Sequence, residues 1–142
     1  DLRFAADNTV FTTAFSRRGL IAEHGISWML PLLVGHANAL DLLMSARRVT
    51  SDEPLRIGLV NRIYPPDQLR EHTYAYARDL ADFVSPSAMA VIKRQLYEVP
   101  FQTLAEATIE ANREMMVALG GSDFREGVAS FMEKRPPRFT GR

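Results

Sequence analysis

The order of hydrophobic and polar positions predicts strands near the start of the chain and helices after them. Residues 2–6 and 10–13 have strand composition, and the Asx residues Asp7 and Asn8 between them suit a turn. Residues 59–64 form a third run of strand type. Because parallel strands need a long crossover connection, the first and third runs are expected to pair in parallel.

Short helices are expected between these strands. Helical spacing covers residues 27–33, with Ser27 as the N-cap, and residues 37–45. Thr50 and Glu53 have the spacing of a capping box, in which each side chain bonds the backbone N–H of the other residue. A helix of one or two turns is therefore predicted to begin there.

Helical periodicity dominates the second half of the chain. It is interrupted at Pro86, Pro100 and the Gly120–Gly121 pair, which separate consecutive helices. The predicted helices cover residues 69–83, 87–98, 101–119 and 123–132. The chain is thus expected to be α/β in class but mostly helical.

Composition narrows the function. The 142 residues suit one domain, and 17 basic residues balance 17 acidic ones, so nucleic acid is not an expected partner. The chain has no cysteine, which excludes disulfides and thiolate chemistry. No apolar run approaches the ~20 residues that span a bilayer, so we expect no membrane partner and a cytoplasmic protein. Because Asp1 leads directly into a strand, an N-terminal part is expected to be missing.

Candidate chemistry is sparse. The three histidines lie far apart in sequence and fit surface or capping roles, so no metal site is predicted. Glu23 lies on a glycine-flanked bend between apolar residues, where desolvation would make its carboxylate a better base. Solvent exposure is the alternative for Glu23. Nearby apolar residues could form a pocket wall or pack in the core: Phe15, Ile26, Trp28 and Met29.

Several motifs together resemble the enoyl-CoA hydratase/isomerase (crotonase) family. The resemblance covers essentially the whole chain and corresponds to the C-terminal half of the family. The motifs are Asp1-Leu2-Arg3-Phe4-Ala5, Phe11, Phe15-Ser16-Arg17-Arg18-Gly19-Leu20-Ile21, Leu30-Pro31-Leu32-Leu33-Val34-Gly35, Ala39-Leu40-Asp41-Leu42-Leu43, Gly58-Leu59-Val60-Asn61-Arg62, Glu126-Gly127, Phe131 and Glu133-Lys134-Arg135-Pro136-Pro137-Arg138-Phe139.

This resemblance implies the end of a spiral of ββα units followed by a helical region that builds a trimer. Residues 1–65 would end the spiral and carry the active-site loop, and residues 66–142 would form the oligomerisation and CoA-contacting region. A homotrimer or hexamer is expected. The two N–H donors of the oxyanion hole, most of the CoA-binding loop and the first hydratase glutamate would precede Asp1, in a missing N-terminal half of the same protein.

The resemblance also implies a catalytic residue. The second hydratase glutamate falls on Phe15, which cannot activate water, whereas the single carboxylate of the related enoyl-CoA isomerases falls on Glu23. Isomerisation of an enoyl-CoA double bond, with Glu23 as proton shuttle, is therefore expected. The alternatives are a 2-enoyl-CoA hydratase in the full-length protein and a non-catalytic oligomerising fragment.

Substrate contacts follow from the same resemblance. No cofactor is expected beyond the coenzyme A that forms part of an acyl-CoA substrate. Residues that match the acyl pocket or the CoA-contacting C-terminal region are Ala14, Phe15, Ile21, Ala22, Gly25, Phe131 and Lys134.

Overall fold

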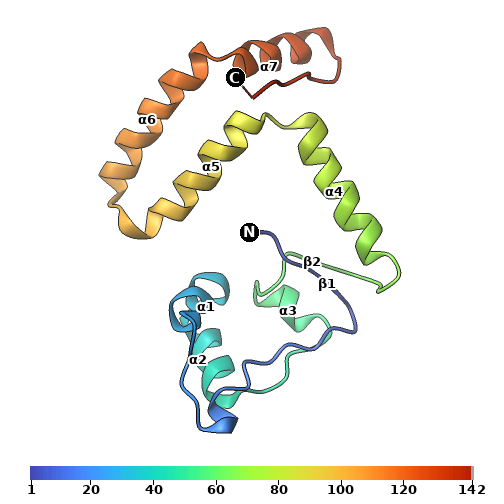
Figure 1. Cartoon of the computed structure of the whole chain (residues 1–142), viewed down its shortest axis with the longest axis vertical. Helices are drawn as coiled ribbons and strands as arrows, with labels where there is room; N and C mark the ends of the chain where they lie inside the picture. Colours follow the sequence, from blue (N-terminus) through green and yellow to red (C-terminus); the bar gives the residue numbers. More distant parts are fainter. Residues whose placement is uncertain (142) are drawn as a thin grey trace. The chain divides into compact units, whose positions relative to one another are not determined.

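A computed structural model of the protein describes residues 1–141. By contact density the chain divides into two compact units, Asp1–Tyr74 and the part that begins at Ala75. The elements in chain order (Figure 1) are β1 (Phe4–Ala6), η1 (Ser16–Arg18), α1 (Ile26–Val34), α2 (His36–Ser45), α3 (Glu53–Arg56), β2 (Arg62–Tyr64), α4 (Leu69–Phe83), α5 (Pro86–Glu98), η2 (Val99–Phe101), α6 (Leu104–Gly120) and α7 (Ser122–Glu133).

The first unit contains a two-stranded parallel sheet. β1 pairs with β2 in parallel, with Ala5 opposite Ile63. Two hydrogen bonds extend this pairing by one residue. The Asn61 N–H donates to the Arg3 carbonyl oxygen, and the Arg3 N–H donates to the side-chain Oδ1 of Asn61, each at 2.7 Å. The parallel pairing predicted for the first and third strand-like runs is confirmed, over shorter strands.

The strand predicted over residues 10–13 is wrong. Only Phe11 pairs there, as an isolated antiparallel bridge to Val49. The hydroxyls of Thr12 and Thr13 donate to carbonyl oxygens at the end of α2. This segment therefore donates hydrogen bonds to the end of α2 and does not form a hairpin with β1.

Helices α1 and α2 pack against each other and form the core of the first unit (Figure 1). Their buried residues form a cluster with Val49: Leu30, Val34, Ala39 and Leu42. Gly58 lies against α1 with a φ of 77°, and a Cβ there would come within 3.0 Å of the Leu33 carbonyl oxygen. Glycine is therefore required where the chain passes α1.

Two predicted helix starts are wrong. α1 begins at Ile26 with Gly25 as its N-cap, so Ser27 lies inside the helix. α3 has Asp52 as its N-cap and no side-chain cap bond. The predicted capping box fails because Arg47 holds the Glu53 carboxylate through two hydrogen bonds, at 2.7 and 2.9 Å.

The helices of the second unit follow the predicted pattern closely. Ser85 caps α5 through its hydroxyl oxygen. A capping box does occur at the start of α6, where Thr103 and Glu106 bond each other's backbone N–H groups. The predicted helix over residues 101–119 therefore starts three residues late, after the short turn of η2, and ends as expected at Gly120.

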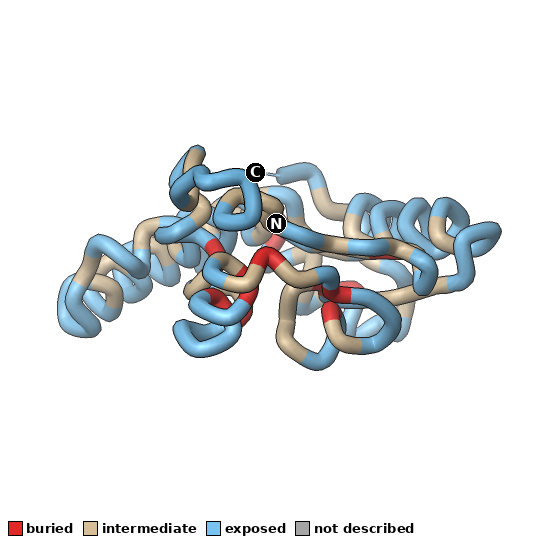
Figure 2. The backbone as a smooth tube through the Cα atoms, turned by 90° about the horizontal axis from the view of Figure 1, so that it is seen from below, coloured by how far each residue is buried: buried red, intermediate tan, exposed pale blue. Residues whose placement is uncertain are grey.

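Burial differs sharply along the chain, and Figure 2 shows long exposed stretches with short buried ones. No residue of α4, α5 or α6, all within the described part of the chain, is buried. The large apolar side chains of α5 and α6 that are more than half exposed include Ile92, Leu96, Leu104, Ile109, Met115, Met116 and Val117. The apolar faces of α5 and α6 are thus little covered by the described residues of the second unit.

Two carboxylates of α7 hold the C-terminal tail. The buried side chain of Asp123 accepts hydrogen bonds from the hydroxyls of Ser85 and Ser87, at 2.6 and 3.1 Å, and from the N–H groups of Thr140 and Gly141. These donors lower the pKa of Asp123 to about 2. The tail and the start of α5 are therefore joined at one carboxylate.

Glu126 acts in the same way one turn later. It accepts a bidentate pair of bonds from the Arg135 guanidinium and a bond from the Arg138 N–H. The bonds from Arg135 and Arg138 lower the pKa of Glu126 to about 2. Both carboxylates are thus ionised wherever the tail is docked, down to strongly acid pH.

Acid should weaken this docking in a predictable window. The ordinary pKa values of the two groups are 3.8 and 4.5, both above the folded values, so their stabilisation is complete above about pH 5 and is lost as the pH falls toward 2. Asp123→Asn should lower proton uptake on unfolding by up to about one proton in this window. Urea unfolding at pH 5, 4 and 3 measures the effect.

The matched control is Asp82→Asn, because Asp82 is exposed on α4. Its pH dependence should equal that of the unmodified protein. The free energy of unfolding should fall less steeply with acid in Asp123→Asn than in Asp82→Asn. Equal steepness in the two variants would contradict the assignment of this pH dependence to Asp123.

Candidate functional site

The candidate loop runs from Ala14 to Gly25 in the first unit. Ala14 has a φ of 60° and His24 a φ of 56°, both in the left-handed region that residues with a Cβ rarely occupy. Gly25 continues this conformation at 76° and begins α1. The loop is thus bounded at both ends by unusual backbone, as is common where a chain is held in one shape for function.

Phe15 lines a cavity of about 430 Å³ in the first unit. Ile26 and Leu30 of α1 contribute apolar wall, and Leu42 of α2 lies on the same cavity. The structure thus places Phe15 and Ile26 in a pocket wall. It leaves Trp28 and Met29, 48% and 43% exposed, outside this wall.

Glu23 lies at the other end of the loop, outside the residues that line this cavity. Its side chain is 38% exposed, and its Oε2 lies 3.6 Å from Nε2 of the exposed His24. The Glu23 carbonyl oxygen accepts from the Ile26 N–H at 3.1 Å, which ties it to the first turn of α1. The backbone of Glu23 is therefore fixed to α1, and its carboxylate is accessible from outside the chain.

The other predicted loop residues differ in exposure. Ala22 is half-buried beside Glu23, whereas Ile21 is 80% exposed. An isoleucine as exposed as this presents a whole apolar side chain to solvent or to a ligand. Ala14 is half-buried next to Phe15. The structure thus brings Ala14 and Phe15 to the cavity end of the loop, and Ile21 and Ala22 to the Glu23 end.

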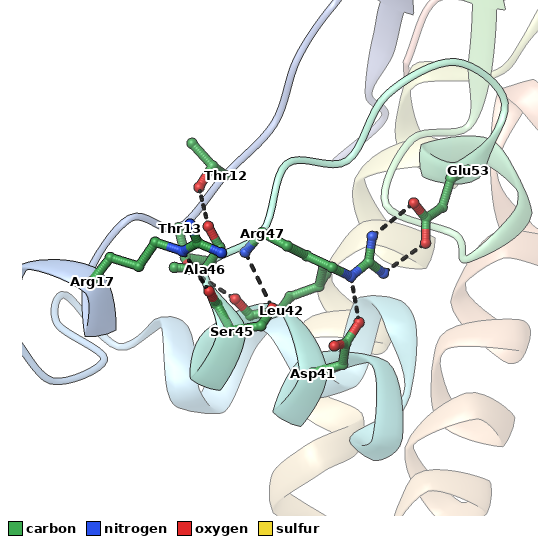
Figure 3. A network of polar contacts seen from close by, with 9 residues as sticks. All are labelled: Thr12, Thr13, Arg17, Asp41, Leu42, Ser45, Ala46, Arg47 and Glu53. Atoms are coloured by element: carbon green, nitrogen blue, oxygen red, sulfur yellow. Dashed lines mark hydrogen bonds and ion pairs between the residues drawn. The ribbon is translucent and has the colours of Figure 1, made fainter.

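Arg47 is the charged residue of the cavity wall (Figure 3). Its guanidinium donates to both Glu53 oxygens and, at 2.7 Å, to Asp41. The bonds from Arg47 lower the pKa of Glu53, and the two carboxylates raise the pKa of Arg47. The positive charge in the wall is therefore paired, which makes it a structural contact.

The remaining predicted residues belong to the second unit. Phe131, 82% exposed, lines an apolar groove of about 840 Å³ together with Met115, Phe124 and Val128. Lys134 ends α7 in the left-handed conformation, with a φ of 53°, and is exposed. Both side chains are therefore accessible at the turn that leads into the tail.

Other features of the site were not predicted from the sequence. Thr12, Thr13 and Arg17 donate hydrogen bonds from their side chains to the last turn of α2 (Figure 3). Their acceptors are backbone carbonyls, which every residue carries. No residue type or spacing therefore marks these pairs in advance.

Among residues 1–141, no group of three or more His, Asp or Glu side chains is placed to hold a metal ion. In the same range, no helix combines the length and the apolar character needed to cross a bilayer.

Comparison with known proteins gives the family. A model of the family described as enoyl-CoA hydratase/isomerase matches residues 1–142. A Rhodobacter capsulatus protein named probable enoyl-CoA hydratase is 36% identical over 143 residues, which are 100% of this chain and 55% of that protein. The 1,2-epoxyphenylacetyl-CoA isomerase of Escherichia coli is 31% identical over 144 residues, covering 100% of this chain and 54% of the isomerase.

Solved structures agree. The crystal structure of an enoyl-CoA hydratase from Polaromonas sp. JS666 matches with a TM-score of 0.91 and 30% identity, over 99% of this chain and 54% of that one. The chain thus spans about half the length of the relatives it matches. The mostly helical chain with its small parallel sheet is a partial crotonase fold, and the protein belongs to the enoyl-CoA hydratase/isomerase family.

Proposed function

We propose that the protein that carries this chain shifts the double bond of an enoyl-CoA, with Glu23 as the proton shuttle. The observation that carries the proposal is the contrast between two positions of one loop. Where the resemblance places a hydratase carboxylate, the apolar Phe15 lines the cavity of the first unit, and where it places the isomerase carboxylate, Glu23 is accessible.

The chemistry suits a single carboxylate. Moving a double bond from C3 to C2 removes a proton from C2 and returns one to C4, so one carboxylate within reach of both carbons performs both transfers without water. Phe15 supports this assignment, because its apolar ring offers no base that could activate a water nucleophile.

The rest of the active site belongs to a segment that precedes Asp1 in this proposal. That segment supplies the two N–H donors that stabilise the enolate oxygen, and most of the CoA-binding loop. Support comes from the comparisons, in which the chain spans 54% and 55% of its relatives.

The helical unit forms a homotrimer or hexamer and contacts coenzyme A through Phe131 and Lys134. Its support is the apolar surface of α5 and α6, which have no buried residue of their own and include Leu104 at 85% exposure. Surface of this kind is typical of helices that pack against another protein surface. A lysine ammonium at the exposed end of α7 suits phosphate binding.

A second candidate is hydration of a 2-enoyl-CoA. Its support is the name of the Rhodobacter capsulatus relative, a hydratase. Phe15 argues against it, because an apolar ring offers no base for activating water.

Glu23→Gln should lower kcat for isomerisation of a 3-enoyl-CoA by about 10²- to 10⁴-fold, the usual contribution of a general acid–base group. The substitution keeps the size of the side chain and removes its basicity. The assay uses the complete protein, checked by intact mass, with crotonyl-CoA as the parallel hydratase substrate.

The matched control is Glu71→Gln, on the exposed surface of α4, which should leave kcat unchanged. Full isomerase activity in Glu23→Gln would refute the role of Glu23. Efficient hydration of crotonyl-CoA would favour the hydratase, and no turnover of either substrate would favour a non-catalytic oligomerising protein.

Lys134→Gln should raise KM for the CoA substrate about three- to tenfold and leave kcat within about twofold, because a charge-assisted bond to phosphate is lost outside the reacting centre. The difference from the unmodified protein should shrink as ionic strength rises. Lys93→Gln on α5 is the control with the same charge change. Equal KM values for the two variants would speak against a CoA contact at Lys134.

A further inference from the structure

The last turn of α2 is capped by side chains of residues 12–17. The last carbonyl groups of a helix have no N–H donor within the helix, and donors from elsewhere satisfy them. The hydroxyl of Thr13 donates to the Leu42 oxygen at 2.9 Å, and that of Thr12 donates to the Ala46 oxygen at 3.0 Å (Figure 3). The segment that leads into the candidate loop is therefore fixed to the end of a core helix.

Arg17 makes the third of these bonds. Its Nε donates to the Ser45 carbonyl oxygen at 2.8 Å, a short and direct hydrogen bond. The guanidinium also brings a positive charge to the carboxyl end of α2, where the helix dipole is negative. Because Arg17 lies in η1, this bond holds the short helical turn that follows Phe15.

Beyond Arg17, no hydrogen bond or ion pair joins residues 18–24 to a residue outside 15–26 in the described part of the chain. Leu20 donates to the Phe15 oxygen at 3.1 Å, and Glu23 accepts from Ile26 at 3.1 Å. Neither these bonds nor the approach of His24 to Glu23 reach outside residues 15–26. The polar contacts that fix residues 20–24 therefore lie at the two ends of the segment, at Arg17 on one side and at α1 on the other.

Both ends of the loop depend on one helix. α1 packs against α2 through buried Leu30 and Val34, and Arg17 bonds the end of α2 directly. The distance that the loop must span is therefore set by α2. A carboxylate that moves a proton between two carbons must be held in a narrow range of positions, and displacement by about 1 Å is enough to cost rate.

We propose that Arg17 is a positioning residue for Glu23, which it holds in place by anchoring η1 to the C-terminal carbonyls of α2. The proposal rests on the proposed isomerase function, since it assigns Arg17 a role in that reaction. Arg17 does not touch the reacting atoms. Its substitution should therefore lower kcat and leave substrate binding largely unchanged.

The test compares Arg17→Gln with Arg18→Gln in the complete protein. Arg18 is its exposed neighbour, and no side-chain hydrogen bond or ion pair of Arg18 is seen within residues 1–141, so the pair matches the charge change and the location. Arg17→Gln should lower kcat about tenfold with KM within about twofold, and Arg18→Gln should change neither. Arg17→Lys keeps a donor and a charge and should recover part of the loss.

Hydrogen–deuterium exchange supplies a readout that does not need activity. Amides of residues 19–25 should exchange faster in Arg17→Gln than in Arg18→Gln, while amides of α1 and α2 should be unchanged. Thr13→Val removes another of the bonds to α2 and should speed exchange in the same loop. The Leu42 oxygen still accepts from the Ala46 N–H, so this variant keeps its helix end satisfied.

The outcomes separate the two proposals. Absence of isomerase turnover in the unmodified protein, or undiminished turnover in Glu23→Gln, overturns the proposed function, and exchange of residues 19–25 still decides whether Arg17 anchors the loop. If the protein isomerises through Glu23 and the two arginine variants show equal kcat and equal exchange, the role of Arg17 is overturned.

Discussion

The carbonyl groups at the end of α2 impose the constraint on which the first unit depends. The Ser45 and Ala46 carbonyls have no N–H donor from the helix and accept from Arg17 and Thr12. Thr13 adds a second bond to the Leu42 oxygen, which already accepts from the Ala46 N–H. The same helix buries Ala39 and Leu42 against α1. One helix therefore supplies both sets of contacts. The side of α2 packs in the core, and its C-terminal end holds the loop, so a change in the packing of α2 would also move the loop.

A paired charge completes this arrangement. Arg47 lies two residues beyond α2 and bonds both Asp41 within the helix and Glu53 in α3. A bidentate arginine–carboxylate pair restricts direction as well as distance. The end of α2 is thus fixed relative to α3 on one side and to the loop on the other, although η1 and α3 are each no longer than four residues.

Sequence reasoning succeeded where the signals are local. Ser85, Pro86 and the Gly120–Gly121 pair end or begin helices by their own conformational preferences, and the helices they separate were predicted to within a few residues. It failed where a partner outside the local motif determines the contact. Glu53 was assigned to a capping box but pairs with Arg47, and residues 10–13 were assigned to a strand although Phe11 alone finds a partner.

The candidate site divides in the same way. Glu23 could be selected in advance because it lies on a glycine-flanked bend and matches the isomerase carboxylate in the family resemblance, and the same resemblance selected Phe15. Arg17 could not, because its partner is the backbone of Ser45, 28 residues away. Whether an arginine meets a helix end depends on how the chain turns at Ala14 and Gly19, which only the folded structure defines.

The tail that returns to Asp123 has a consequence for how the protein can be handled. Thr140 and Gly141 donate to a carboxylate that also receives Ser85, so the last described residues close a loop of 17 to 18 residues and complete the cap of a distant helix. Thr140 and Gly141 are therefore part of the folded unit. An affinity tag belongs after a flexible spacer beyond Gly141, because removing Thr140 and Gly141 would take two N–H donors from Asp123 and leave it only the bonds from Ser85 and Ser87.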